Sequence, residues 1–567
     1  MGGSVSGAAH TLLRREAFIT GTMTTMETRV QSQEVEGVSG RVQTPFVHRF
    51  ATEGNHYVFD VNSGEILRVD PVVWEIIEDS HLDEEEVIAK HTSQFTPSQI
   101  STAYNDIVRA RAEQGLFVEY HPHVKMNLSR QAVYDKIASE REMLMLEVTE
   151  KCNFQCTYCP HNLPDSGAVY HGTRDMSWET ARAAIDDFLQ HCKTPGPTVG
   201  ASSLPTPSDP PKSSDDDDNV AMSFYGGEPL LNFPLIKRCT EYALEKAKIK
   251  LDFFMTTNGY LLKGETADFL ADHDFTLIVS LDGPASIHDR HRRTRDDLPT
   301  HAVVLDNVKT WIRKYPRSKP YCISATVARD TDPRDVYAYF SRASWIPPDT
   351  ETMVSSASPP YPGYYKFDPG EQGLRGRQEA YDKYKEDLIR GRVGAGYEGL
   401  EMRLRRIQAE GPFRRLHRGR WEVAGARRHS ACCSPGRPCV LGAHRTFVTV
   451  TEDYYPCERV ARTEACRIGS VATGIDEEKA YRLLKEFVEA TAESCERCWC
   501  LPICVLDCHG MVRSKDGYTL AARQQECEGI QKFMHQRIVD YCSVLEQNPH
   551  AFDYLNSTED EIGDVRG

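Results

Sequence analysis

Three cysteines that lie within eight residues are the strongest chemical signal in the sequence. Cys152, Cys156 and Cys159 occur in LEVTEKCNFQCTYCPHN (146–162) with the spacing C-x3-C-x2-C, directly after an apolar stretch. Each corner of an iron–sulfur cube takes one thiolate, and short spacers let a single loop supply several of them. Three thiolates leave one iron without a protein ligand, and an open coordination position is where a metal can bind a reactant. Plain buried thiols or a zinc site are the alternatives for these residues.

A second group of cysteines lies near the C-terminus, between residues 432 and 527. The stretch CERCWCLPICVLDCHG (495–510) has the spacing C-x2-C-x5-C-x3-C, and Cys527 follows after a gap of 18 residues. Clustered cysteines in a chain without an export signal more often hold metal than form disulfide bridges. Because C-x2-C pairs also make zinc knuckles, zinc is the alternative to iron–sulfur here.

Polar motifs follow several of the apolar stretches. FYGGEPLL (224–231) contains two glycines that let their own backbone approach a ligand closely, and a glutamate that can accept hydrogen bonds from an ammonium group. TTNG (256–259) and SLDG (280–283) end two further stretches, where polar side chains can reach a ligand at the mouth of a barrel. HDRHRRTRD (288–296) adds arginines, and a guanidinium can clamp a carboxylate through two hydrogen bonds.

The elements that must position these residues alternate between strand and helix. Apolar, β-prone stretches predict strands at 143–149, 221–225, 253–258, 275–283 and 321–327. Helices are predicted between them, for example at 177–192 and 235–248. This alternation predicts an α/β protein built from parallel β/α units, as an open sheet or as a full or partial barrel.

The region before these units predicts a small separate module at 44–122. HYVFDV (56–61) and EILRVD (65–70) alternate apolar and polar residues around NSG, which predicts a hairpin. Helices are predicted from Pro71, at about 82–92, and from the capping box Thr96–Gln99 to Gly115, with a last strand at 116–120. A hairpin with three helices is typical of a winged-helix module. The module either stabilises the chain or captures a peptide that adds a strand to the hairpin edge.

Composition limits the classes of partner. The 567-residue chain has a formal charge of -16, which argues against a nucleic-acid binder, and no apolar run has the roughly 18 residues that cross a membrane. Without a signal for export we expect a cytoplasmic protein. Residues 1–43 are predicted to be a disordered extension, 193–220 a flexible acidic insert, and 351–430 a linker or helical region.

The C-x3-C-x2-C loop, with the aromatic Tyr158 before its last cysteine, resembles the signature of the radical S-adenosylmethionine (SAM) enzymes. The Gly-Gly-Glu-Pro motif resembles the family element that contacts the SAM amino group. The resemblance implies a partial (β/α)6 barrel at 140–350, with a [4Fe-4S] cluster on Cys152, Cys156 and Cys159 whose open iron binds SAM. The SAM-contacting residues that it implies are Tyr158, Gly226, Gly227, Glu228, Asn258, Ser280 and Asp282.

The C-terminal cysteines, at 431–545, resemble the SPASM extension of these enzymes, which implies two auxiliary [4Fe-4S] clusters. Cluster I would use Cys433, Cys439, Cys457 and Cys508, and cluster II would use Cys495, Cys498, Cys504 and Cys527. One departure is Glu452, because the family usually has glycine five residues before the cysteine of YPC. Cys432, Cys466 and Cys500 have no role in this scheme, and the other cysteines are predicted to be structural: Cys192, Cys239, Cys322 and Cys542.

Module, core and extension together resemble the maturases of ribosomally made peptides, whose front module is a precursor-recognition element that holds the leader peptide. The resemblance implies an oxidoreductase that crosslinks the peptide through a 5′-deoxyadenosyl radical. The expected bond is a thioether, with carbon–carbon and carbon–oxygen bonds left open, and the expected electron donor is a flavodoxin or ferredoxin. An anaerobic sulfatase-maturing enzyme and a non-catalytic iron–sulfur carrier are the alternatives. No catalytic side chain is assigned.

Overall fold

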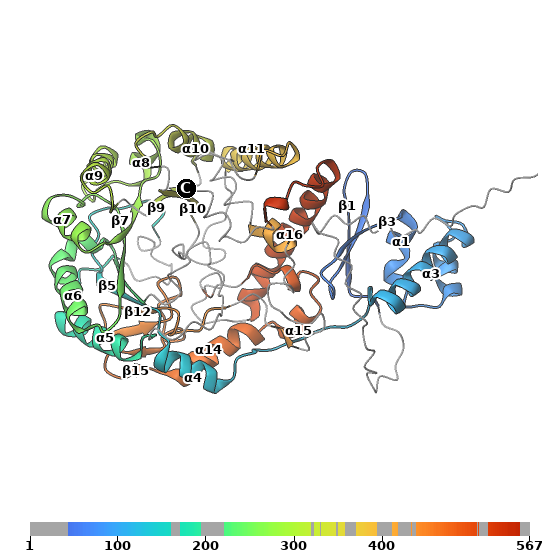
Figure 1. Ribbon diagram of the computed structural model, residues 1–567, viewed down its shortest axis with the longest axis horizontal. Helices are drawn as coiled ribbons and strands as arrows, with labels where there is room; N and C mark the ends of the chain where they lie inside the picture. The colour runs from blue at the N-terminus through green and yellow to red at the C-terminus, as the bar shows by residue number, and fades with distance from the viewer. Residues whose placement is uncertain are drawn as a thin grey trace, which may run out of the picture.

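A computed structural model describes residues 44–159, 171–193, 220–318, 322–328, 330–347, 350–357, 370–393, 411–417, 432–433, 438–506, 509 and 520–555. The predicted extension, the acidic insert from 194 to 219, and Cys508 lie outside the described residues. Figure 1 shows an arc of β/α units on one side, C-terminal helices in the middle, and the N-terminal module beyond them. Among the described helices, none combines the length and the apolar composition that a membrane span needs.

Six parallel strands in chain order form the main sheet, which confirms the α/β class. Each strand pairs in parallel with the next one along the chain. The five strands predicted from sequence are all present, and a sixth at 351–356 follows them. The strands are β5 (Met143–Thr149), β6 (Val220–Gly226), β7 (Leu251–Thr257), β8 (Thr276–Ser280), β9 (Cys322–Val327) and β10 (Glu351–Ser356).

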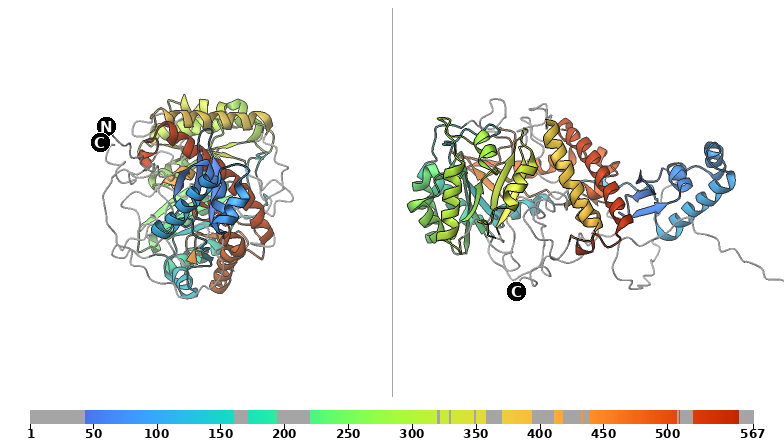
Figure 2. Two further views of the ribbon diagram at one scale, coloured as in Figure 1. Left: turned by 90° about the vertical axis from the view of Figure 1, so that its right-hand side faces the viewer. Right: turned by 90° about the horizontal axis from the view of Figure 1, so that it is seen from above.

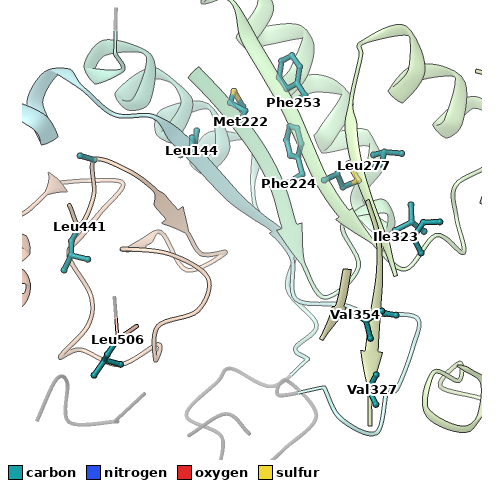
Figure 3. Close-up of a cluster of buried hydrophobic side chains, with 14 of the residues drawn as sticks. Leu144, Met222, Phe224, Phe253, Leu277, Ile323, Val327, Val354, Leu441 and Leu506 are labelled. Atoms are coloured by element: carbon teal, nitrogen blue, oxygen red, sulfur yellow. The ribbon is translucent and has the colours of Figure 1, made fainter. Parts of the chain in front are cut away.

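Helices cover the outer face of this sheet (Figure 1), and the strand pattern shows why. Along β7 the side chains of Leu251, Phe253 and Met255 are buried, whereas Phe254 and Thr256 between them are only half-buried. Alternate residues of a strand face opposite sides, so the apolar set packs on the helices and the other set lines the inner face. Figure 3 shows such helix-facing side chains on neighbouring strands. The helices are α5 (Trp178–His191), α6 (Phe233–Lys246), α7 (Gly264–Asp272), α8 (Ala285–His291), α9 (His301–Lys314) and α10 (Pro333–Ser341).

The C-terminal segment extends the same sheet. Strand β12 (Thr446–Val448) pairs in parallel with β5, and three short antiparallel strands continue from it. The buried ion pair between Glu147 of β5 and Arg462, at 2.5 Å, joins the two regions. The three short strands are β13 (Asp453–Tyr455), β14 (Gly469–Ser470) and β15 (Gly474–Ile475).

The N-terminal module has a core of its own, built from a three-stranded antiparallel sheet and three helices. The predicted hairpin and helices are confirmed, including the capping box at Thr96. The strand predicted at 116–120 is wrong. Phe117 has a φ of 56°, and its N–H donates to the Asp60 carboxylate, so this segment does not join a sheet. The elements are β1 (Val47–Ala51), β2 (His56–Asp60), β3 (Ile66–Val69), α1 (Pro71–Ile76), α2 (Glu84–His91) and α3 (Pro97–Gln114).

The module is seated on the C-terminal helix α16 (Leu520–Gln547), as Figures 1 and 2 show. His48 of β1 stacks on Trp499 with ring centroids 3.7 Å apart and planes 7° from parallel. Its Nε2 lies 2.9 Å from Nδ1 of His535 on α16. One oxygen of Glu546, further along α16, accepts hydrogen bonds from three module side chains at 2.7–2.8 Å: Thr52, Asn55 and Tyr57. We call Trp499, His535 and Glu546 the docking surface.

We expect docking to weaken in mild acid. Burial, and then the neighbouring His535, lower the pKa of His48 from 6.5 to about 4. An undocked module exposes His48, which then binds a proton more readily. The contribution of neutral His48 to docking is therefore fully present above pH 6.5 and is lost progressively as the pH falls toward 4. Small-angle scattering should show the radius of gyration rising between pH 7 and pH 5. A His48→Phe variant keeps the stack without a titrating group; an equal rise in that variant would contradict the assignment to His48.

Candidate functional site

The three motif cysteines lie on the loop that follows β5, at the carboxyl edge of the parallel strands. All three are partly buried. Burial raises the pKa of Cys152 to about 12, and the nearby Glu228 carboxylate and the other two thiols add to the rise. The structure therefore brings together the three predicted ligands and Glu228 from the loop after β6.

Part of the arginine motif has a role that the sequence did not predict, because it holds the cysteine loop in place. Residues 291–295 run alongside the cysteine loop: the Gln155 N–H donates to the Arg293 carbonyl at 2.8 Å, and the Thr157 N–H donates to the His291 carbonyl at 3.0 Å. The Arg295 guanidinium donates to the Cys152 carbonyl at 2.8 Å. The His291 ring lies 2.8 Å from the Thr157 hydroxyl and 2.9 Å from Asp330, after β9. No local pattern in the sequence reveals these long-range contacts.

The Gly-Gly-Glu motif packs on the start of the cysteine loop. The N–H groups of Gly227 and Glu228 donate to the carbonyls of Thr149 and Lys151 at 2.9 and 2.8 Å. A Cβ on Gly226 would lie 2.2 Å from the Thr149 oxygen, and a Cβ on Gly227 would lie 2.2 Å from the Lys151 oxygen. The two glycines thus allow the backbone of the cysteine loop to approach closely, and their contact with SAM stays a prediction.

Glu228 is fully buried behind that contact, and burial raises its pKa. Its carboxylate accepts hydrogen bonds from the Thr257 hydroxyl and the Asn258 N–H, each at 2.7 Å. The Asn258 side chain donates to Asn153 of the cysteine loop at 2.8 Å. Asn258 therefore ties the end of β7 to both the glutamate and the cysteine loop.

Asp282, after β8, forms a second buried group with Tyr158 and Arg292. Asp282 accepts from the Tyr158 hydroxyl and, at 2.9 Å, from the N–H of Thr326 on β9. Arg292 donates to the Tyr158 oxygen at 2.9 Å and lies 3.9 Å from the Asp282 carboxylate. The Nε of Arg292 is buried and has no hydrogen-bond partner among the described residues.

Arg290 and Arg293 of the same motif face other groups. Arg290 donates to Thr331 at 3.0 Å, and Arg293 pairs with the exposed Asp297 at 2.5 Å. Two arginine side chains of the motif face the cysteine loop: Arg292 contacts Tyr158, and Arg295 contacts the Cys152 carbonyl. Ser280 lies on the half-buried inner face of β8, paired in register with Ser324 of β9. The predicted SAM-contacting residues thus lie at one edge of the sheet, with Ser280 on its inner face.

The donor set fits an iron–sulfur cluster. Among the described residues, no three Cys, His, Asp or Glu side chains converge on one point as the ligands of a single ion do. Thiolates of a cluster bind different irons and need no common point, and soft thiolates suit iron–sulfur chemistry. Arg292 offers a buried cation with an unused donor, which suits a carboxylate ligand.

The C-terminal cysteines form a second group. Burial raises the pKa of Cys498 to about 12, and the neighbouring thiols of Cys504, Cys495 and Cys527 add to the rise. These are the four residues predicted for cluster II. Cys500, which has no predicted role, is buried beside them. The structure therefore gathers five cysteines where the motif requires four.

The predicted ligands of cluster I are less completely described. Cys457 packs beside Tyr225 and Met145 of the main sheet, whereas Cys439 is exposed. Cys433 lies in the two-residue strand β11 (Cys432–Cys433), which pairs with β4 (His123–Val124). The ligand set of cluster I stays a prediction. Cys192, Cys239, Cys322 and Cys542 are buried, as predicted.

Glu452, which stands where the family usually has glycine, adopts a backbone conformation that a glycine would favour. Glu452 lies in the turn between β12 and β13 with a φ of 70°, and its carboxylate accepts a hydrogen bond from the Thr180 hydroxyl at 3.0 Å. A left-handed conformation costs a side-chain-bearing residue about 1–2 kcal/mol. The hydrogen bond to α5 offsets part of that cost.

We expect Glu452→Gly to stabilise a chain that already carries Thr180→Val. In that background the hydrogen bond is absent. Glycine removes the cost of the left-handed conformation but makes the unfolded chain more flexible, and the balance should add about 0.5–1 kcal/mol to the free energy of unfolding. Chemical denaturation of the single and double variants measures the difference. Glu452→Gln, which retains both the conformation and an acceptor oxygen, should leave the wild-type value unchanged; destabilisation by glycine would show that no strain exists.

These features define an α/β protein with a thiol-bearing site at the carboxyl edge of a parallel sheet. No family model matches the chain. It is similar to the radical SAM cyclopropyl synthase TigE of Paramaledivibacter caminithermalis, with 22% identity over 44% of this chain and 50% of TigE. It is also similar to a cysteine-type anaerobic sulfatase-maturating enzyme of Clostridium perfringens strain 13, with 26% identity over 29% of this chain and 38% of that one. The chain thus spans half the length, or less, of these curated relatives.

The fold has a counterpart among solved structures. Histidine-tagged anSMEcpe with bound AdoMet superimposes with a TM-score of 0.50 and 17% identity, covering 75% of this chain and 98% of that one. At this identity the match shows the fold alone. The chain is therefore similar in sequence to radical SAM enzymes over part of its length, and its α/β fold resembles that of an AdoMet-bound protein.

Proposed function

We propose that the protein is a radical SAM enzyme that installs a crosslink, expected to be a thioether, in a ribosomally made precursor peptide. The observation that carries the proposal is the gathering of the three motif thiols, buried Glu228 and buried Arg292 at one edge of the sheet. When bound, a [4Fe-4S] cluster and SAM supply a 5′-deoxyadenosyl radical. Cys152, Cys156 and Cys159 would hold the cluster.

The chain's own residues would bind and orient the cosubstrate. Glu228 would accept hydrogen bonds from the ammonium group, because a buried carboxylate favours a cationic partner. Arg292 would bind the carboxylate with the Nε that has no partner among the described residues. The segment 291–295 and Asn258 would hold the cysteine loop in one conformation, so that cluster and cosubstrate meet at a fixed place.

The N-terminal module supports a peptide substrate. In the described part of the module, β3 pairs with β2 alone, so an extended leader peptide can add a strand at its other edge. Holding the leader there raises the effective concentration of the segment to be modified. We further propose that the two C-terminal cysteine groups hold auxiliary iron–sulfur clusters.

Sulfatase maturation is the second candidate function. Sequence similarity to sulfatase-maturating enzymes of Clostridium and Bacteroides favours it. A protein of that function would convert a cysteine or serine of a sulfatase peptide to formylglycine. The module at 44–122 favours a substrate with a leader instead.

One anaerobic experiment separates these functions. The reconstituted protein is incubated with SAM, a reductant, and either a cysteine-bearing precursor peptide or a sulfatase peptide, and products are read by mass spectrometry. Formation of 5′-deoxyadenosine, with loss of two hydrogens from the precursor and loss of its alkylatable thiol, supports thioether formation. Loss of two hydrogens with the thiol intact indicates a carbon–carbon or carbon–oxygen bond. An aldehyde in the sulfatase peptide supports sulfatase maturation, and absence of 5′-deoxyadenosine overturns the radical SAM assignment.

A further inference from the structure

The seat of the N-terminal module is built from the segment that carries the second cysteine group. Trp499, on which His48 stacks, lies directly between Cys498 and Cys500. Phe59 of the module also meets the Trp499 ring, edge-on at 6.4 Å between centroids. Because Cys498 and Trp499 are consecutive residues, the same local backbone conformation determines the orientation of the indole and that of the Cys498 thiol.

The linker that leaves the module is held by the same segment. The Val124 N–H donates to the Glu496 carboxylate at 2.9 Å, and the His121 ring lies 2.8 Å from the Glu496 carbonyl. Val124 is buried in one small cluster with Cys495 and Leu501. Glu496 ends helix α15 (Ala492–Glu496), one residue after Cys495 and two before Cys498.

Helix α16 connects the same two places. It carries Cys527 and Gln531, and the Gln531 amide donates to the Cys498 sulfur at 3.4 Å. Further along, it carries His535 and Glu546, which bind the module. The cysteines and all three residues of the docking surface thus lie on two segments, 495–504 and α16.

We propose that the metal centre held by Cys495, Cys498, Cys504 and Cys527 sets the position of the N-terminal module. Ligation ties the loop 495–504 to α16, and the free energy of metal binding then stabilises the conformation in which Trp499, His535 and Glu546 form one surface. Loss of the centre releases the loop, and the module loses the stack on Trp499 and the anchor of its linker. This inference rests on the proposed function only in that these cysteines hold a cluster.

The coupling must act in both directions. If the centre favours docking, docking favours the centre by the same factor, since linked binding equilibria are reciprocal. A peptide bound to the module is then held at a fixed place relative to the barrel only while the centre is intact. Trp499 and Glu546 are positioning residues in this scheme, and neither touches the cosubstrate site.

Hydrogen–deuterium exchange of the linker 121–126 tests the forward direction, because the Val124 and Met126 amides donate to Glu496 and Glu489, and release of the linker would expose them. In the chain reconstituted with iron and sulfide, we expect Cys498→Ser and Trp499→Ala to speed this exchange by about tenfold. Trp499→Phe, which restores a stacking ring, should return it to the wild-type rate. Trp345→Ala, the same change on the barrel, is the matched control and should have no effect.

Iron retention tests the reverse direction. In a chain whose Cys152, Cys156 and Cys159 are alanine, we expect Glu546→Ala to speed removal of the remaining iron by a chelator, whereas Trp345→Ala should not. Wild-type protein without iron after reconstitution would overturn the proposed function. Full iron loading of the wild-type protein, together with unchanged linker exchange in Cys498→Ser, would overturn this inference alone. Unchanged iron loss in Glu546→Ala would overturn it in the same way.

Discussion

We expect simultaneous replacement of Cys152, Cys156 and Cys159 by alanine to reduce formation of 5′-deoxyadenosine from SAM to the level of a protein-free control. The three thiols are the ligands that the loop after β5 offers to a cluster, and three of its four irons would lose their protein ligands together. The fold should persist, because the thiols are only partly buried and the loop keeps its backbone hydrogen bonds to residues 291–295. Iron content should fall by about four atoms per chain.

The control is a cysteine that packs without a predicted ligand role. Cys192→Ala removes a thiol that is 7% exposed at the end of α5, and it should leave iron content and 5′-deoxyadenosine formation unchanged. Electron paramagnetic resonance of the reduced triple variant should show the signals of the C-terminal centres without the SAM-responsive one. Continued cleavage of SAM by the triple variant would place the catalytic cluster elsewhere.

The parts of the fold that the sequence predicted are those with a local signal. The strand at 253–258 reads as β-branched and aromatic residues, and its burial alternates as the pattern requires. Strand β10 was missed because ETMVSS is short and polar, and it is a strand through its pairing with β9. The strand predicted at 116–120 failed for a long-range reason, since the Asp60 carboxylate, 57 residues away, takes the Phe117 N–H.

The candidate site likewise has residues that a local sequence signal predicts and residues that only long-range contacts bring into place. Its cysteines, Glu228 and Asp282 stand in motifs of fixed spacing, so the sequence located them. The role of residues 291–295 in holding the cysteine loop could not be predicted, because the bonds from Arg295 to the Cys152 carbonyl and from His291 to Thr157 join residues more than 130 positions apart. Sequence reasoning treated Arg290, Arg292 and Arg293 alike. Burial and partners, which depend on the fold, single out Arg292.

We expect Gly227→Ala to disrupt the cysteine loop while leaving the C-terminal cysteine group intact. The added Cβ would lie 2.2 Å from the oxygen and 2.5 Å from the carbon of the Lys151 carbonyl, distances that no packing tolerates. The two backbone segments cannot simply move apart, since the hydrogen bonds of Gly227 and Glu228 to Thr149 and Lys151 hold them together. Overpacking together with the loss of these bonds should cost about 3 kcal/mol in the free energy of unfolding. Iron bound at 152–159 should be lost, because displacement of Lys151 moves the adjacent Cys152.

Gly529→Ala is the matched control, and its effect should have the opposite sign. Gly529 lies within α16, and a Cβ there would meet nothing within 4 Å. Alanine is favoured over glycine inside a helix, so this change should raise the free energy of unfolding by up to about 1 kcal/mol. Thermal denaturation, iron analysis and the 5′-deoxyadenosine assay on both variants compare one methyl group placed against a backbone carbonyl with one placed in open space. If Gly227→Ala kept wild-type iron and activity, the glycine motif would not support the cysteine loop, and the geometry on which the cosubstrate site is proposed would be wrong.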